Sequence, residues 1–295
     1  MIALMDIGGT SIKYGIIDPE TEQYKLLGEL TTNVREPNFQ VENRIDEVIR
    51  RGFSQYKING ISISTAGIVD NQSGVIVYAN KNIPNYKGTK LKENLEEKYE
   101  IPVTIENDVN SALLGELHFG LLKEVHSALM ITIGTGVGGA LYINNEIYEG
   151  FSHSAGEIGY AIINGKNIEK IASTTALVRN VKDRVGKKDI DGHWIFQQAI
   201  EQNNSVCIEE INNLMVNIAF LINNYVALIN PEVVILGGGI MEQSAFLKPL
   251  IVEKFNELNK NKFVIENTKI EFAKLGNQAG LLGAYCHYKN QIING

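Results

Sequence analysis

The sequence contains few cysteines, and it has no excess of basic residues. Only Cys207 and Cys286 occur in 295 residues, which disfavours a disulfide-held secreted domain and favours two buried thiols in a cytoplasmic protein. Lys and Arg number 27 against 34 Asp and Glu, giving a net charge of −7. This balance argues against nucleic acid or an anionic membrane as a partner. No uninterrupted run of eighteen apolar residues occurs, so no membrane-spanning helix is expected.

The remaining composition is that of an ordinary globular protein. Hydrophobic residues make up 44% and charged residues 21%, and no low-complexity linker interrupts the chain. A length of 295 residues is enough for two domains or one large one.

A glycine turn between two apolar segments is the first distinctive motif. Asp6-Ile7-Gly8-Gly9-Thr10 leads through Lys13 into further apolar residues. Gly8 and Gly9 lack side chains where a backbone would approach an anion, Thr10 offers a hydroxyl and Lys13 a charge. Asp6 is placed to orient water on a metal ion. Taken alone, a plain hairpin with a solvated lysine explains the motif about as well.

The same layout returns in the second half of the chain. Gly134, Thr135, Gly136 and Gly138 lie in a glycine-rich stretch that also follows an apolar segment, and aligning Gly8 with Gly134 keeps the flanking segments in register. The second copy lacks the Lys-Ser/Thr of a P-loop, and it leads into a strand, which disfavours a dinucleotide-binding fingerprint. Two such turns indicate a duplicated fold that holds a nucleotide's phosphates.

Strands and helices alternate along the chain, which predicts an α/β fold. The pattern places a domain boundary near residues 115–125, with domains at 1–118 and 119–283 and a closing helix, 284–295, packed back on the first. Strands are predicted in a hairpin over 1–18, at 26–30, 58–65, 74–78 and 103–106, in a hairpin over 128–143, and at 233–236 and 269–272. Helices are predicted at 41–56, 91–99, 110–122, 169–185, 193–202, 205–229 and 279–288, with a long irregular loop over 149–167.

Three polar segments follow these strands or lie in the long loop. Glu106-Asn107-Asp108-Val109-Asn110 follows a strand, where α/β sheets bind ligands, and a carboxylate there can accept a hydroxyl proton. Asp108 is favoured in that role, although Asp108 or Asn110 as a helix N-cap is the commoner use of such residues. Glu157 in the loop has the chemistry to bind two sugar hydroxyls, or it is a simple exposed acid. Gly237 and Gly238 form a strand-to-helix turn against which a base or ribose can lie.

Together these motifs resemble the ROK family of actin-like sugar kinases, over nearly the whole chain. The resemblance implies two actin-like (ribonuclease H-like) domains around a central cleft, with ATP and Mg²⁺ bound, and a homodimer. It implies that Asp108 is the base toward a sugar 6-hydroxyl. By the same carry-over, the sugar-binding residues are Gly67, Asn82, Asn107, Asp108, Glu157 and Glu169.

One departure from the family concerns zinc. Many members hold a zinc ion through a histidine and three cysteines, but Tyr160 stands where that histidine is expected. No cysteine lies between Tyr160 and Glu169, so no structural zinc is expected. Tyr160 is expected to contact the substrate instead. Zinc-less relatives that the chain resembles include β-glucoside kinases and some N-acetylmannosamine kinases.

The expected function is therefore an ATP-dependent kinase acting on the 6-hydroxyl of glucose, N-acetylmannosamine or a β-glucoside. A transcriptional repressor of the same family is less favoured, because the Asp6 motif begins almost at Met1. Two further candidate functions are a non-catalytic sugar sensor and an actin-like assembly protein. The intact Asp108 and both glycine turns argue against the sensor, and Glu106-Asn107-Asp108 with Glu157 points to a small polyhydroxyl ligand and away from an assembly protein.

Overall fold

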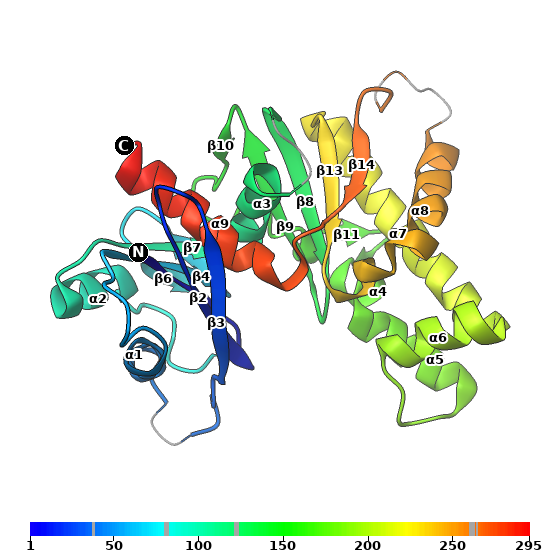
Figure 1. The fold of residues 1–295 in the computed structure, drawn as a ribbon. Coiled ribbons are helices and arrows are strands. Elements are labelled where there is room, and N and C mark those ends of the chain that lie inside the picture. The colour runs from blue at the N-terminus through cyan, green and yellow to red at the C-terminus, as the bar shows by residue number, and fades with distance from the viewer. Residues whose placement is uncertain (37–38, 80–82, 121–123, 260–262, 264) are drawn as a thin grey trace. The chain divides into compact units, whose positions relative to one another are not determined.

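The chain forms two compact units, each built around its own five-stranded sheet (Figure 1). The structure is a computed structural model that describes residues 1–36, 39–79, 83–120, 124–259, 263 and 265–295. The first unit comprises Met1–Lys123, Gly150–Ser154 and Asn277–Gly295. The second comprises Glu124–Glu149 and Ala155–Gly276. The mixed α/β class predicted from the alternating pattern is confirmed.

The sheet of the first unit has the strand order β3-β2-β1-β4-β7. β1 pairs antiparallel with β2 and parallel with β4, and β4 pairs parallel with β7. The carboxyl ends of β1, β4 and β7 therefore lie at one edge of the sheet. The strands are β1 (Ile2–Ile7), β2 (Ser11–Ile17), β3 (Tyr24–Thr31), β4 (Gly60–Thr65) and β7 (Val103–Asn107).

The second sheet repeats this topology, with the order β10-β9-β8-β13-β14. β8 takes the place of β1, pairing antiparallel with β9 and parallel with β13. The duplication predicted from the two glycine turns is therefore present in the strand order. The strands are β8 (Ser127–Ile133), β9 (Val137–Ile143), β10 (Glu146–Ile147), β13 (Val233–Gly237) and β14 (Lys269–Phe272).

One face of the first sheet is apolar, and the other face carries polar residues among apolar ones. Along β4, Ile61 and Ile63 belong to a buried core shared with α1 (Val41–Gly52) and α2 (Leu91–Tyr99). Successive side chains of a strand point to opposite faces, so Ser62 and Ser64 face the other way. On that face lies α9 (Ala279–Tyr288), beside α3 (Asp108–His118) (Figure 1). The segment Asn277–Gly295, which includes α9, belongs to the first unit.

The helix α7 (Ser205–Ile229) forms the centre of the second unit. Ten of its residues are buried, and all of them except Glu210 belong to the hydrophobic core of this unit. By length and composition α7 is apolar enough to cross a membrane. The sequence predicted no such helix, because it has no uninterrupted run of eighteen apolar residues. Half of the most apolar window of α7 is buried, and core helices of soluble proteins pass the same test, so this composition is weak evidence for a membrane.

Several predicted elements differ from those observed, and the helix predicted over 41–56 ends at Gly52. α3 begins at Asp108, not Asn110, because Asn107 caps it. The predicted helix over 169–185 is two helices, α4 (Glu169–Ala172) and α5 (Thr174–Val185), because the extended Ser173 between them caps α5. The loop over 149–167 contains a 3-10 turn and a small hairpin. The remaining elements are β5 (Ile68–Asp70), β6 (Val75–Tyr78), η1 (Ile158–Tyr160), β11 (Ile162–Ile163), β12 (Lys166–Asn167), α6 (Gly192–Gln202), η2 (Gly239–Gln243), α8 (Ser244–Leu258), η4 (Gly276–Gln278) and η5 (Lys289–Ile293).

Candidate functional site

The carboxyl edge of the first sheet gathers three predicted site segments. Ile7 of β1 pairs with Thr65 of β4, and Thr65 pairs with Asn107 of β7, so the three residues lie side by side across the parallel strands. Adjacent strands lie about 4.8 Å apart, so the chain that leaves each strand emerges beside the next. This register places the first glycine turn and Asp108 at the same edge, although about one hundred residues separate them in sequence.

The first turn is a tight connection held from behind. The Gly8 N–H donates to the Ser11 carbonyl at 2.9 Å, and the buried Thr32 hydroxyl donates to the Gly8 carbonyl at 2.7 Å. Thr10, at the tip of the turn next to Gly9, is exposed. The turn therefore presents Gly9 and Thr10 outward, as a phosphate-binding role requires.

Asp6 and Lys13 flank this turn as a cross-strand pair. The Ser64 hydroxyl donates to Asp6 Oδ1 at 2.8 Å, and Lys13 Nζ donates to Asn277 Oδ1 at 3.0 Å. Desolvation raises the pKa of Asp6, and the Ser64 hydrogen bond and the Lys13 charge oppose that shift. The turn thus contains one acid and one base within reach of an anion or a hydrated cation.

Asp108 is the first residue of α3, and its carboxylate is oriented by its neighbours. Asp108 Oδ1 accepts hydrogen bonds from Asn107 Nδ2 and from the Val109 N–H, both at 3.0 Å. The capping role falls on Asn107, whose Oδ1 accepts from the Val109 and Asn110 N–H groups. The alternative in which Asp108 or Asn110 is the N-cap is therefore wrong, and the Asp108 carboxylate is half-buried.

Gly67 lies against the same segment. Asn107 Nδ2 donates to the Gly67 carbonyl at 2.8 Å. Gly67 has φ +110°, and a Cβ there would lie 2.6 Å from the Tyr78 carbonyl oxygen, so glycine is required. Asn82, predicted to line the floor of the sugar site, lies outside the described residues.

The second unit repeats the glycine turns at the carboxyl ends of β8 and β13. Gly134 and Gly136 connect β8 to β9, with Thr135 between them. Gly237 pairs with Thr132 of β8, and a Cβ on Gly238 would lie 2.3 Å from the Ile133 carbonyl oxygen. Because of this close approach, the chain leaves β13 directly beside the Thr135 turn. Gly138 lies within β9, so it is a strand residue and not part of the turn.

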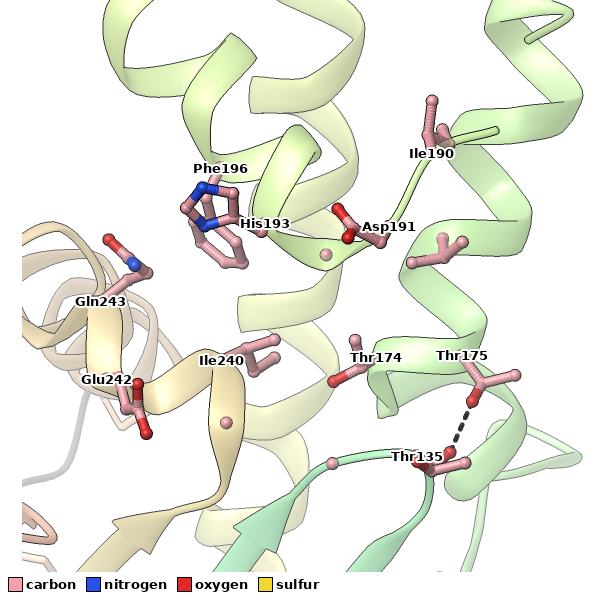
Figure 2. Close-up of a pocket in the computed structure, with 14 residues that line it drawn as sticks. Thr135, Thr174, Thr175, Ile190, Asp191, His193, Phe196, Ile240, Glu242 and Gln243 are labelled. Atoms are coloured by element: carbon pink, nitrogen blue, oxygen red, sulfur yellow. Dashed lines mark hydrogen bonds between the residues drawn. The ribbon is translucent and has the colours of Figure 1, made fainter. Parts of the chain in front are cut away.

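A pocket of about 660 Å³ opens beside the Thr135 turn (Figure 2). Helices α5 and α6 and the 3-10 helix η2 all begin at its wall. The Thr175 hydroxyl donates to the Thr135 carbonyl at 2.7 Å, which attaches the start of α5 to the turn. The lining residues are Gly134, Thr135, Thr174, Thr175, Val178, Ile190, Asp191, Gly192, His193, Phe196, Gly239, Ile240, Glu242 and Gln243.

The lining divides into an apolar part and a polar part. Val178, Ile190, Phe196 and Ile240 supply apolar surface, which suits a flat base. The turn and the first residues of the helices supply N–H and hydroxyl groups, and helix N-termini favour anions. The pocket is therefore chemically suited to a nucleotide.

Sequence reasoning missed most of this pocket. Of the predicted nucleotide-binding residues, Gly134 and Thr135 line it, whereas Gly237 and Gly238 are not among its lining residues. Asp191 carried a local signal, since it caps α6 by accepting from the Trp194 N–H at 2.8 Å. No local pattern connects this cap with the Thr135 turn, because their proximity arises from tertiary packing.

Glu157 and Glu169 form an acidic pair in the second unit. Glu169 Oε2 accepts from the Val137 N–H at 3.3 Å, and a Cβ on Gly136 would lie 2.4 Å from that oxygen. Glu169 is thus attached to the end of the Thr135 turn. Desolvation by neighbouring atoms, and then the charge of Glu169, raises the pKa of Glu157. Tyr160, three residues further on, is 66% exposed, which leaves its ring accessible to a ligand.

We expect Glu169→Gln to lower the pKa of Glu157 toward its ordinary value of 4.5, because the substitution removes the neighbouring charge. A carboxyl group whose pKa is higher in the folded state than in the unfolded state stabilises the fold at pH values below its ordinary pKa. This contribution is lost as the pH rises through the raised pKa. Carboxyl-detected NMR titration measures the shift, with Glu271→Gln on β14 as the control. An unchanged titration of Glu157 would contradict the coupling.

Zinc ligation has no support in the described part of the chain. No group of three or more His, Cys, Asp or Glu side chains suited to a metal ion occurs among these residues. Cys207 and Cys286 are both buried and free.

The comparisons with known proteins agree with this architecture. The family model described as "ROK family" matches residues 2–291. An uncharacterized protein of Clostridium perfringens is 44% identical over 99% of both chains. A beta-glucoside kinase of Listeria monocytogenes is 31% identical over 97% of both chains, and xylose repressors are also among the relatives.

Solved structures give the same result. A ROK family protein from Streptococcus pneumoniae in complex with sucrose has a TM-score of 0.86 at 30% identity, covering 100% of this chain and 99% of that one. A Streptomyces griseus ROK family glucokinase in complex with glucose and AMPPNP has a TM-score of 0.80 at 25% identity, covering 96% and 97%. With its two sheets of shared topology and a family match across residues 2–291, this chain belongs to the ROK family.

Proposed function

We propose that this protein is an ATP-dependent kinase that phosphorylates the 6-hydroxyl of a hexose or hexose derivative. The observation that carries the proposal is the pocket beside the Thr135 turn, where an apolar wall adjoins backbone and hydroxyl donors. Relatives of this chain include sugar kinases, and one related structure contains glucose together with a nucleotide analogue.

The nucleotide is assigned to the second unit. A pocket of about 660 Å³ lies within the range typical of small-molecule sites. The base would pack against Phe196 and Ile240, and the phosphates would lie toward Thr135 and the start of α5. In the first unit, the turn with Gly8, Gly9, Thr10 and Lys13 has by itself the chemistry of a phosphate-binding turn.

Asp108 is the proposed base. Its orientation by Asn107 and the Val109 N–H keeps one carboxylate oxygen in place while the other accepts the proton of the sugar hydroxyl. That deprotonated oxygen would then attack the γ-phosphorus in line, and the bond from the γ-phosphorus to the β–γ bridging oxygen would break as ADP leaves. In the first unit, Asn107 is a proposed sugar-binding residue. In the second unit, Glu157, Tyr160 and Glu169 are proposed sugar-binding residues.

Magnesium fits the donor set in a limited way. Mg²⁺ is commonly bound by one or two carboxylates, water and the phosphates of the substrate, and the single carboxylate of Asp6 beside the first turn matches that pattern. When bound, Mg²⁺ would neutralise charge on the phosphates. Asp6 would orient its water ligands, and Ser64 would hold the Asp6 carboxylate in position.

The alternative is a non-catalytic sugar-sensing member of the family, since xylose repressors are among the relatives. The pocket and the oriented Asp108 favour the kinase, because a sensor needs neither a nucleotide pocket nor a positioned base. A cytoplasmic location and a homodimer remain predictions.

A coupled ADP-release assay with Mg-ATP tests the proposal. The sugars are glucose, N-acetylmannosamine, N-acetylglucosamine, fructose, allose and cellobiose, and ATP without sugar controls for hydrolysis by water. We expect sugar-dependent ADP release with one of them. If ATP and a sugar both bind by calorimetry and no sugar-dependent ADP forms, the sensor is correct and the kinase is wrong.

A further inference from the structure

The carboxylate of Glu106 is buried directly behind the Asp108 segment. Glu106 is 0% exposed and is the residue of β7 that precedes Asn107. Its Oε1 accepts from the Asn107 N–H at 2.7 Å and from Asn110 Nδ2 at 3.0 Å. Its Oε2 accepts from Asn71 Nδ2 at 3.1 Å. A buried carboxylate needs such donors, and here two of the three belong to the segment that carries Asp108.

His287 of α9, the helix that packs on this face of the sheet, lies next to the Glu106 carboxylate. Its Nδ1 lies 3.6 Å from Glu106 Oε2, and the side chain is 4% exposed. At this separation the contact is electrostatic and longer than a hydrogen bond. Within the described residues Nε2 is buried without a hydrogen-bond partner, and Nδ1 is the ring nitrogen that lies toward Glu106.

The sequence periodicity of α9 explains why His287 faces Glu106. Gly280, Ala284 and His287 have the i, i+4, i+7 spacing of one helix face. A Cβ on Gly280 would contact Asp6 and Ser64, and the Ala284 carbonyl accepts from the Ser62 hydroxyl at 2.6 Å. This face of α9 therefore packs on the face of the sheet that carries Ser62 and Ser64, and it reaches Glu106 at its end.

Burial favours the neutral form of the His287 imidazole. Desolvation lowers its pKa below the ordinary 6.5, Glu106 opposes this shift, and the charge of Lys92 adds to it. A neutral imidazole has one N–H, and the carboxylate beside Nδ1 favours the tautomer that carries the proton there. His287 thus directs an N–H dipole at Glu106 without adding a buried charge.

We propose that His287 is a positioning residue for Asp108 and acts through the buried Glu106 carboxylate. The proposal rests on the kinase function proposed above, in which Asp108 is the base. His287 fixes Glu106, Glu106 fixes the Asn107 N–H and the Asn110 amide, and Asn107 in turn holds Asp108 Oδ1. A change at the C-terminal end of α9 is thereby transmitted to the Asp108 carboxylate.

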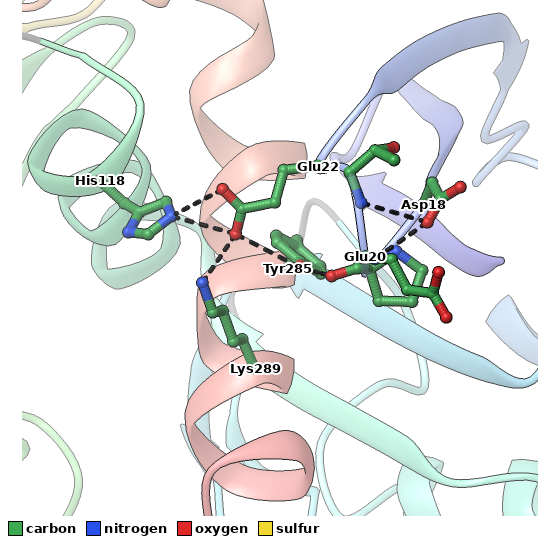
Figure 3. A network of polar contacts seen from close by, with 8 residues as sticks. Asp18, Glu20, Glu22, His118, Tyr285 and Lys289 are labelled. Atoms are coloured by element: carbon green, nitrogen blue, oxygen red, sulfur yellow. Dashed lines mark hydrogen bonds and ion pairs between the residues drawn. The ribbon is translucent and has the colours of Figure 1, made fainter.

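The opposite end of α3 offers a matched control (Figure 3). His118 Nε2 lies 3.3 Å from Glu22 Oε2, and Lys289 of η5 donates to Glu22 Oε1 at 2.7 Å. His118 is thus also a histidine paired with a glutamate in the same unit. It differs in being exposed and in lying at the end of α3 that is far from Asp108.

The test compares His287→Leu, His287→Asn and His118→Leu with the wild-type protein. Leucine fills the space without a donor, whereas the asparagine Nδ2 takes nearly the position of imidazole Nδ1. Two quantities are measured: hydrogen exchange of the Asn107, Val109 and Asn110 amides, and sugar-dependent kcat and KM. Exchange is independent of catalysis, so it separates this inference from the kinase proposal.

In His287→Leu we expect the hydrogens of these three amides to exchange with solvent about tenfold faster. We also expect kcat to fall about tenfold with little change in KM. His287→Asn and His118→Leu are expected to stay within about threefold of wild type in both. An equal loss of kcat and of amide protection in His287→Leu and His287→Asn would overturn the proposal, since it would show a packing role alone.

The proposal can still be tested if His287→Leu does not fold. Wild-type-like exchange and kcat in His287→Asn then support the proposal, and a tenfold loss of kcat and of amide protection in His287→Asn overturns it. Absence of turnover in every protein refutes the kinase, and unchanged exchange in His287→Leu refutes the positioning role separately.

Discussion

Asp108→Asn is expected to reduce sugar-dependent turnover by about 10²–10⁴-fold, because the variant lacks the base that removes the hydroxyl proton. Asparagine keeps an acceptor oxygen for Asn107 Nδ2 and for the Val109 N–H, so the start of α3 should retain its shape. The sugar dissociation constant should therefore change by less than about threefold. The coupled ADP-release assay measures turnover, and calorimetry with the same sugar measures the dissociation constant.

Asp70→Asn is the matched control for this experiment. Asp70 is another carboxylate of the first unit that accepts local hydrogen bonds, from the Gln72 and Ser73 N–H groups and the Ser73 hydroxyl. It ends β5 and has no place in the proposed chemistry, so turnover should stay near the wild-type value. Near-normal turnover in Asp108→Asn would show that Asp108 is not the base.

Gly283→Ala is expected to destabilise the protein by about 3 kcal/mol, because α3 and α9 pack backbone against backbone at this glycine. A Cβ on Gly283 would lie 1.5 Å from the Ser111 carbonyl oxygen and 2.3 Å from its carbon. A Cβ on Gly115 would lie 2.6 Å from the Ala279 carbonyl oxygen, so the contact involves glycines of both helices. Backbone atoms cannot move aside as a flexible side chain can, and α3 must therefore shift away from α9.

Urea unfolding followed by circular dichroism measures the loss, with a separate probe for each unit because the two units need not unfold together. Asn290→Ala, an exposed position in η5, is the control and should change the free energy of unfolding by less than about 0.5 kcal/mol. Since α3 begins at Asp108, Gly283→Ala should also lower turnover. Unchanged stability in Gly283→Ala would show that the two helices are not in backbone contact at this site.

Local sequence patterns predicted much of the architecture. The alternation of apolar residues predicted β4, and the helical spacing of apolar residues predicted α1 and α7, because each pattern reflects burial of one face. The two glycine turns predicted the duplication, and the sheets share one strand order. Helix starts were less accurate at α3 and at α5. The cap at Asn107 competed with two neighbouring capping residues, and Ser173 lay inside an otherwise continuous helical pattern.

The sequence by itself therefore determined the fold class, the repeat and the identity of the polar segments, since these depend on residues close together in the chain. Tertiary structure decided which segments meet. Parallel pairing brings the Gly8 turn beside Asp108, and packing of α5, α6 and η2 forms the pocket at Thr135. It also places His287 against Glu106, 181 positions earlier in the chain. Neither residue carries a local signal for the other, because a contact between distant segments depends on how the whole sheet and its helices pack.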